Sequence, residues 1–277
     1  MIIINTLACA GLDRLPDGEW KLHSRFSQAI NFCHPGGELL TLFRYGKGMG
    51  PTGVLLNTEQ FPRVANVKRI IKQGNTLQAL NMMIRSHRVL RLQLPATAFT
   101  PVDLSFYTHQ SGLVGSLNQP LDIMPLYPEI IAQLECWHHG AVPDWRWLIG
   151  RGPGLTPSGD DMLTGMIAVL YACGIFTQQP SFLPPADRLA QLTTSVSCSY
   201  LNSARIGEFS TPVLKVIRSL QSGRDPHSAI CRLLAVGHTS GADIVLGIAI
   251  AQRWLQVSDS RRRHARSGNN THVYSGC

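Results

Sequence analysis

Two glycine-rich segments, each followed directly by an apolar run, constrain the fold of this chain more than any other feature. Residues 150–161 contain four glycines and two prolines, and residues 237–243 form a second, shorter segment of the same kind. Glycine and proline are costly inside regular structure, so their concentration here indicates a loop with a defined backbone role. Each segment predicts a loop that opens a helix.

The two helix starts share a sequence pattern. Residues 158–165 read SGDDMLTG and residues 240–247 read SGADIVLG, so both follow S-G-x-D-x-x-x-G. We interpret the match as a repeat, with chance similarity between two helix starts as the alternative. A repeat predicts that the two helices pack side by side, with Gly165 and Gly247 permitting the close approach and both N-termini directed at one cleft.

Small anions are the predicted ligands of this cleft. Helix N-termini carry unpaired backbone N–H groups and the positive end of the helix dipole, so phosphate or carboxylate would bind there, with an arginine as a clamp. The predicted substrate-binding residues of the first loop are Arg151, Gly152, Gly154, Thr156, Ser158 and Gly159. Those of the second loop are Thr239, Ser240, Gly241 and Asp243.

Asp160, Asp161 and His238 are the predicted catalytic residues. Two carboxylates would repel an anion unless they have another role, and three interpretations stay open. One aspartate caps the helix; one accepts hydrogen bonds from a substrate amide or acts as a general base; or the pair holds Mg²⁺ against a phosphate. Apart from that Mg²⁺ alternative, we expect neither a metal nor a cofactor. Histidine exchanges protons near neutral pH, so His238 is an acid or base candidate, with a structural histidine as the alternative.

A segment rich in small residues lies between the two loops, at residues 195–205. Close helix packing explains its composition. Asn202 and Arg205 lie about one helical turn apart, so both could also reach an anion from one face, and we add them to the predicted substrate-binding residues. Cys198 has no evident base partner in the sequence, which disfavours thiol chemistry.

Residues 1–112 predict a β-rich lobe. Residues 1–11 read as an edge strand, and three β-favouring runs follow, HSRFSQAINF, ELLTLFR and GVLLN, separated by glycine- and proline-containing turns. Residues 75–86 have helical spacing, whereas residues 89–94 alternate apolar and polar side chains, which indicates a strand.

Residues 113–258 predict a mainly helical lobe, so the fold class is α+β, with the β-rich lobe packed on the helical one. Expected helices cover residues 129–138, 160–173, 186–204, 212–221, 226–236 and 242–257. Residues 259–277 are polar, basic and aperiodic, which is typical of a disordered tail.

Composition excludes several other classes of protein. No apolar run is long enough to span a bilayer, and seven cysteines without a CxxC pair favour a reducing compartment, so we expect a cytoplasmic protein. The formal net charge is +8, but four arginines of the tail supply half of it, which makes nucleic acid an unlikely partner.

Three segments, WLIGRGPGLTPSGDDMLTG, SVSCSYLNSA and LLAVGHTSGAD, together resemble the AllH-type subunit of bacterial oxamate carbamoyltransferase. The resemblance extends through GELLTLFR and GMGPTG, and covers most of residues 15–257. Position 159 is glycine where members of the family can differ, and the basic tail has no counterpart in the family.

The resemblance implies transfer of a carbamoyl group between phosphate and oxamate, with carbamoyl phosphate and oxalurate as the carbamoylated partners, in purine-derived nitrogen catabolism such as allantoin degradation. It also implies a hetero-oligomer with FdrA-type subunits and a further carbamoyltransferase subunit, and leaves open which subunit carries the catalysis. Two alternatives remain: a non-catalytic scaffold subunit of an FdrA-type complex, and a Mg²⁺-dependent hydrolase that uses Asp160 and Asp161.

Overall fold

The computed structural model describes residues 1–97, 101–179 and 181–268. A curled nine-stranded sheet forms the N-terminal lobe, in the order β1-β9-β8-β7-β3-β4-β5-β6-β2. Its strands are β1 (Ile2–Asn5), β2 (Ala8–Ala10), β3 (Gly18–Arg25), β4 (Ala29–Cys33), β5 (Leu39–Arg44), β6 (Gly53–Leu56), β7 (Arg69–Gln73), β8 (Thr76–Ala79) and β9 (Met82–Arg85). Most neighbouring strands are antiparallel, whereas the β1–β9 and β5–β6 pairs are parallel.

The inner face of the curled sheet encloses its own hydrophobic core. Side chains alternate between the two faces of a strand, so Trp20, Ile70 and Ile84 point inward from three strands and are fully buried. Lys72 is also buried, and its ammonium group pairs with the Asp17 carboxylate at 2.6 Å. The outer face of the same strands is exposed to solvent.

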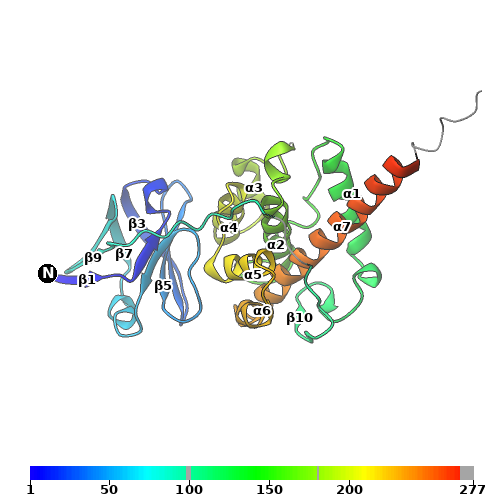
Figure 1. Ribbon diagram of the computed structural model, residues 1–277. Helices are drawn as coiled ribbons and strands as arrows, with labels where there is room; N and C mark the ends of the chain where they lie inside the picture. The colour runs from blue at the N-terminus through cyan, green and yellow to red at the C-terminus, as the bar shows by residue number, and fades with distance from the viewer. Residues whose placement is uncertain (98–100, 180, 269–277) are drawn as a thin grey trace, which may run out of the picture.

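The C-terminal lobe consists of helices around α2 and α7. Its helices are α1 (Tyr127–His138), α2 (Ser158–Ala172), α3 (Ala186–Leu192), α4 (Ser195–Arg205), α5 (Thr211–Gln221), α6 (His227–Leu234) and α7 (Ser240–Gly268). A small hairpin of β10 (Gln110–Ser111) and β11 (Gly115–Ser116) packs against α7. Figure 1 shows the sheet at one end of the molecule and the helices at the other. The predicted α+β class is therefore confirmed.

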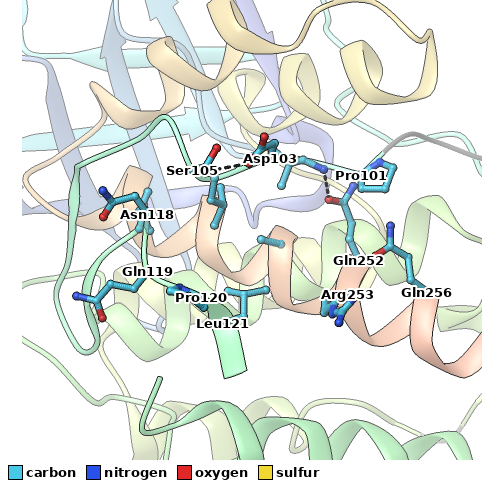
Figure 2. A pocket seen from close by; sticks show the side chains of 14 residues that line it. Pro101, Asp103, Ser105, Asn118, Gln119, Pro120, Leu121, Gln252, Arg253 and Gln256 are labelled. Atoms are coloured by element: carbon cyan, nitrogen blue, oxygen red, sulfur yellow. Dashed lines mark hydrogen bonds between the residues drawn. The ribbon is translucent and has the colours of Figure 1, made fainter. Parts of the chain in front are cut away.

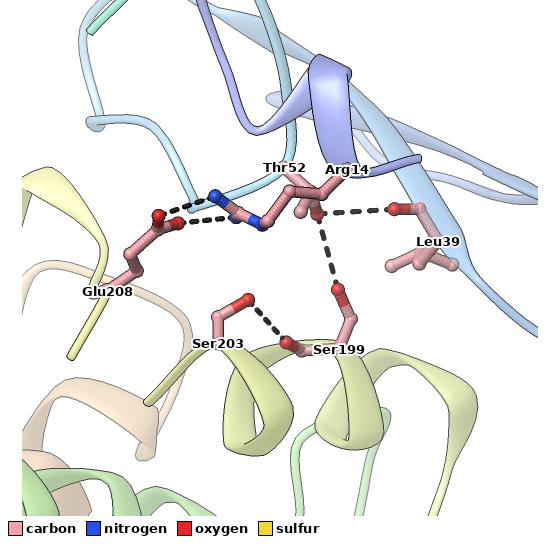
Figure 3. A network of polar contacts seen from close by, with 6 residues as sticks. All are labelled: Arg14, Leu39, Thr52, Ser199, Ser203 and Glu208. Atoms are coloured by element: carbon pink, nitrogen blue, oxygen red, sulfur yellow. Dashed lines mark hydrogen bonds and ion pairs between the residues drawn. The ribbon is translucent and has the colours of Figure 1, made fainter. Parts of the chain in front are cut away.

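The two lobes are joined by polar contacts as well as by apolar packing (Figure 3). Arg14 of the β-rich lobe forms an ion pair with Glu208 of the helical lobe. The Thr52 hydroxyl donates to the Leu39 carbonyl at 3.2 Å and lies 3.3 Å from the Ser199 hydroxyl of α4. These contacts hold the loop before β6 against the helices.

Two secondary-structure predictions for the β-rich lobe are wrong. Residues 75–86 form the β8–β9 hairpin instead of a helix, because β7 and β1 supply ladder partners that outweigh a short helical pattern. Residues 89–94 alternate as a strand would, yet make only isolated bridges, Cys9 to Val89 and Gln93 to Glu208. The first bridge lies within the β-rich lobe and the second joins the two lobes.

Two boundaries in the helical lobe also differ from the expectation. The predicted helix 186–204 is divided into α3 and α4, because Thr193 leaves the helical conformation and Thr194 caps α4 through a hydrogen bond from the Ser197 N–H. Helix α7 continues to Gly268, so residues 259–268 are helical rather than disordered. A formed helix is extended at little cost, because each added residue makes one hydrogen bond. Residues 269–277 lie outside the described part of the chain.

No helix in the described ranges has the length and apolar character needed to cross a membrane.

Candidate functional site

Helices α2 and α7 cross in direct backbone contact, and glycine makes the crossing possible. A Cβ atom on Gly165 would lie 2.1 Å from the Ile244 carbonyl oxygen, and one on Gly247 would lie 2.0 Å from the Met162 carbonyl oxygen. The two contacts are reciprocal, since each glycine faces the residue that lies three positions before the other. The prediction that Gly165 and Gly247 permit close helix packing is confirmed.

The start of each helix is pressed against the chain that precedes it. A Cβ atom on Gly159 or Gly241 would lie 2.0 Å from a carbonyl oxygen, that of Leu148 or Leu233. The Gly159 N–H donates to the Arg151 carbonyl at 2.9 Å, and the Gly241 N–H donates to the Val236 carbonyl at 3.1 Å. These two amides are therefore already paired within their own loops, and the substrate-binding role of Gly159 and Gly241 stays a prediction.

Side chains from the two starts meet at one place. The Thr156 hydroxyl of the first loop lies 2.9 Å from the Ser240 hydroxyl of α7, so the loops are adjacent rather than on opposite faces of the molecule. Asp161 and Asp243, which occupy equivalent positions of the repeat, are both buried. We refer to Thr156, Ser158, Asp161, Ser240 and Asp243 as the junction.

Asp243 is held by the β10–β11 hairpin. Its Oδ1 accepts a hydrogen bond from the Ser111 hydroxyl at 2.5 Å and another from the Gly112 N–H at 3.0 Å. Gly112 approaches the junction so closely that a Cβ atom there would lie 2.0 Å from the Ser158 hydroxyl. The hairpin therefore covers the α7 side of the junction.

Three buried polar atoms of the junction have no hydrogen-bond partner of standard geometry among the described residues, although the Ser158 hydroxyl is close enough to the Asp243 carboxylate to lower its pKa. They are Asp161 Oδ2, Asp243 Oδ2 and the Ser158 hydroxyl oxygen. Leaving such an atom unpaired typically costs about 1 to 3 kcal/mol, so native structures retain few of them without a reason. A ligand that donates and accepts hydrogen bonds at short range would satisfy all three.

Burial favours the neutral form of the junction carboxyl groups. It raises the pKa of Asp161 well above the ordinary value; the hydroxyls of Ser240 and Thr156 oppose this shift, and the charges of Asp243 and Asp160 add to it. Burial also raises the pKa of Asp243, against the stabilising effect of the Ser111 hydroxyl. A protonated Asp161 would not repel an anion and could donate a hydrogen bond to it.

Both carboxylate oxygens of Asp160 accept hydrogen bonds from other parts of the chain. Its Oδ1 accepts from the Gly150 N–H at 2.9 Å and its Oδ2 accepts from the Thr193 hydroxyl. No side chain caps α2, whose N-cap is Pro157, so the interpretation of an aspartate as the helix cap is wrong. Asp160 instead ties the glycine-rich loop to the segment before α4.

In the described chain, no three His, Cys, Asp or Glu side chains are grouped as metal ligands, so a metal here would need ligands from outside those residues.

Four predicted site residues lie on the surface around the junction. Arg151, Gly152, Gly154 and His238 are exposed, and Thr239 is half-buried beside Gly112. Gly152 and Gly154 have φ angles of 116° and 90°, which explains why glycine is required there. These residues therefore lie outside the buried part of the junction.

Arg205 and Asn202 are engaged elsewhere. The Arg205 guanidinium donates to the Pro184 carbonyl at 2.6 Å and to the Leu183 carbonyl at 3.3 Å, and it also contacts Asn202 Oδ1 at 3.4 Å. Burial lowers the pKa of Arg205. The structure does not bring this pair to the junction, because these contacts tie the end of α4 to residues 181–184.

Several residues at or beside the junction were missed at the sequence level, among them Ser111, Gly112, Thr193 and Tyr200. Burial, together with the charge of Asp161, raises the pKa of Tyr200 to about 12, so this phenol is a neutral donor. A Cβ atom on Gly50 would lie 2.7 Å from its hydroxyl oxygen. The GMGPTG motif therefore marked the part of the β-rich lobe that reaches α4.

Burial and then the charge of Asp160 raise the pKa of Cys198 to about 11, which disfavours a thiolate nucleophile.

A cavity of about 320 Å³ lies away from the junction, between residues 101–121 and the middle of α7 (Figure 2). Amide side chains surround it, including Asn118, Gln119 and Gln256. The Val102 N–H donates to Gln252 Oε1 at 2.7 Å at its edge. Together with the Asp243 contacts, this hydrogen bond fastens the segment before α1 to α7 at two points.

Two family models match this chain. The model described as AllH family N-terminal domain matches residues 5–98, and the model described as oxamate carbamoyltransferase subunit AllH matches residues 148–252. No solved structure matches the chain. The second match spans both glycine-rich loops, α2 and the buried part of α7, so it includes all the residues of the junction. The chain belongs to the AllH family of oxamate carbamoyltransferase subunits.

Proposed function

We propose that the junction binds the small anionic substrates of the carbamoyltransferase and positions them for carbamoyl transfer between phosphate and oxamate. The observation that carries this proposal is the group of unpaired, buried polar atoms where α2 and α7 begin. Both helix dipoles place their positive ends there, which favours an anion over a neutral ligand of the same shape.

The substrates carry hydrogen-bond donors and acceptors that would complement the unpaired atoms of the junction. Oxamate and oxalurate each combine a carboxylate with amide N–H groups, and carbamoyl phosphate combines an NH₂ group with a phosphate. An amide N–H would donate to Asp243 Oδ2, and a protonated Asp161 would donate to a carboxylate or phosphoryl oxygen. Tyr200 supplies a second neutral donor beside Asp161.

The reaction requires one proton to change place. When a phosphate oxygen attacks the ureido carbonyl carbon of oxalurate, a C–O bond forms and the C–N bond to oxamate breaks. The oxamate nitrogen gains one proton and the phosphate loses one, so no net proton is consumed. In our proposal Asp161 gives its proton to the leaving nitrogen and regains one from the phosphate.

The proposal includes the partners that the resemblance implies. Family membership makes this chain a subunit, and we propose FdrA-type subunits and a further carbamoyltransferase subunit as its partners. Arg151 and His238, exposed beside the junction, would then face substrate or partner only in the assembled complex. We also propose a cytoplasmic location, in purine-derived nitrogen catabolism.

The direct test is an assay of carbamoyl phosphate formation from oxalurate and phosphate, with the chain co-purified with its partner subunits. Titration of the chain alone with oxamate and with phosphate separates the proposal from the scaffold alternative, which predicts no binding by the chain under conditions where the complex is active. A chelator arm tests the Mg²⁺ alternative. Hydrolysis that stops when metal is removed would contradict the proposal. The Mg²⁺ alternative would require Asp160 to bind the metal with oxygens that already accept hydrogen bonds from the protein.

A further inference from the structure

The outer edge of β1 presents unpaired backbone groups. In the described chain β1 pairs only with β9, and its Ile2 N–H donates to the Asn81 carbonyl at 2.7 Å. The Thr6 N–H, directly after β1, donates to the Arg85 carbonyl at 2.9 Å. Because N–H groups alternate along a strand, those of Ile3 and Asn5 point away from the sheet. Figure 1 shows β1 and β9 at the end of the molecule farthest from the helices.

Large apolar side chains are concentrated at this edge. Met1, Ile2 and Ile3 are 74%, 52% and 53% exposed, and Ile71 of β7 is 55% exposed. The pairing register places Ile71, Gln78, Met83 and Ile3 in one row across the outer face of the sheet. Exposed apolar side chains grouped at the edge of a sheet, as Met1, Ile2 and Ile3 are, are typical of an interaction surface.

The turn between β8 and β9 adds an unusual residue to the same edge. Leu80 is 94% exposed and has a φ of 40°, in the left-handed region that non-glycine residues rarely adopt. Both features are unfavourable for the isolated chain, and burial of the side chain in an interface would offset them.

The opposite edge of the sheet shows how an edge is normally protected. Ala8, Cys9 and Ala10 of β2 are all buried. Proteins protect exposed edges with proline, lysine, bulges or covering segments. The sequence Ile-Ile-Ile-Asn of β1 has none of these residues, and its edge is bare in the described structure.

The charges beside the row of apolar residues indicate the chemistry of the partner. Arg85 is exposed on the outer face of β9, the strand next to β1, whereas Lys21 and Arg69 are exposed farther in, where Arg69 pairs with Glu19 at 3.4 Å. A second copy of the chain would add the same strand, Ile-Ile-Ile-Asn, which has no acidic side chain to pair with Arg85. An acidic segment would complement this arginine.

We propose that β1 is an interaction edge, on which an extended acidic strand of a partner subunit of the carbamoyltransferase adds to the sheet. The backbone of that strand would pair with Ile3 and Asn5, its apolar side chains would cover Ile3, and its carboxylates would face Arg85 of the neighbouring β9. The proposal rests on family membership and on the existence of partner subunits, and not on any role of the junction.

The test uses the tagged full chain co-expressed with the FdrA-type subunits. Ile3→Lys is expected to reduce the recovered partner at least ten-fold, and Arg85→Glu several-fold. Ile123→Lys is the matched control, because Ile123 is 65% exposed in the helical lobe and lies on the other lobe from β1; it should leave recovery unchanged. Hydrogen exchange of the wild-type complex should show the Ile3 and Asn5 amides exchanging at least ten-fold more slowly than in the chain alone.

The exchange measurement keeps the test decisive even if Ile3→Lys does not fold, since it uses the wild-type chain. Unchanged exchange of both amides in the complex would overturn the proposal, as would full recovery of partner by a folded Ile3→Lys chain. Self-association of the isolated chain that protects the same amides would overturn it in favour of a homodimer edge. An intact complex without transferase activity would count against the proposed function instead.

Discussion

The starts of α2 and α7 have the same motif and the same glycine packing, but their aspartates have different surroundings. Asp243 Oδ1 accepts two hydrogen bonds from the β10–β11 hairpin, whereas Asp161 accepts no hydrogen bond of comparable geometry from the described residues. The repeated motif therefore determines how the helices cross. What packs on each start determines whether its aspartate stabilises the fold or is available to a ligand.

The segments that cover the two starts come from different parts of the chain. Residues 101–126 cross α7 and bring Ser111 and Gly112 to Asp243. The α2 start instead lies near Tyr200 of α4, which contacts Gly50 of the β-rich lobe. The half of the junction that holds Asp161 is thus built across the contact between the two lobes.

The crossing glycines should have the largest effect on stability. Gly165→Ala and Gly247→Ala each place a Cβ atom about 2 Å from a backbone carbonyl oxygen, which cannot move without separating the helices. Each is expected to lower the free energy of unfolding by about 3 kcal/mol or more, measured by urea denaturation. Lys215→Ala on the exposed face of α5 is the control and should change it by less than about 0.5 kcal/mol. A tolerated alanine at either glycine would mean that the helices cross less closely than described.

The second prediction separates the two aspartates. Asp161→Asn should reduce transfer in the assembled complex at least 100-fold without lowering the melting temperature, because Asp161 makes few contacts that hold the fold. Asp243→Asn should lower the free energy of unfolding by about 1 to 3 kcal/mol, because an amide weakens the hydrogen bonds from Ser111 and Gly112. The steady-state assay and thermal denaturation are run on both variants.

The opposite pattern would reverse the assignment. If Asp243→Asn removed activity without loss of stability and Asp161→Asn did the reverse, the α7 start would be the functional one. Full activity of Asp161→Asn would reduce this residue to a structural role.

The pairing of the helices could be predicted from sequence because it depends on local features. Glycine at Gly165 and Gly247 permits close packing wherever the helices lie, and the shared motif indicated that they lie together. The β-rich and helical lobes also follow from patterns within short segments. These predictions needed no knowledge of long-range contacts.

What covers the junction could not be predicted, because it depends on contacts between residues distant in sequence. Ser111 lies 132 positions from Asp243, and no pattern in residues 101–116 indicates that contact. For the same reason the sequence could not show that the Arg205 guanidinium, which we predicted to bind substrate, donates to the carbonyl groups of residues 183 and 184. Residues 75–86 became a hairpin because strand partners on both sides outweighed their local spacing.

The third prediction uses pH to test the protonation of Asp161. Its pKa is raised in the folded chain, so between about pH 4 and that raised value the unfolded chain loses the proton while the folded chain keeps it. The contribution of Asp161 to stability is therefore fully present below about pH 4 and is lost as pH rises, by about 1 kcal/mol per pH unit within that window. Asp161→Asn should flatten the decrease in stability from pH 5 to pH 7. An unchanged slope would mean that Asp161 is ionised in the folded protein.

The smallest effect on stability is expected at the C-terminal end of α7, which makes this helix longer than α2. Helix α2 is buried almost throughout and ends at Ala172, whereas α7 continues beyond its last fully buried side chain, Trp254, whose Nε1 donates to Glu135 Oε1 at 3.1 Å. Deleting residues 259–277 removes the last turns of α7, where extension of a formed helix adds about one hydrogen bond per residue. The free energy of unfolding should change by less than about 1 kcal/mol and transfer activity should be retained, whereas Trp254→Ala should cost about 3 to 5 kcal/mol. A large fall in melting temperature after the deletion would show that the end of α7 has a structural role.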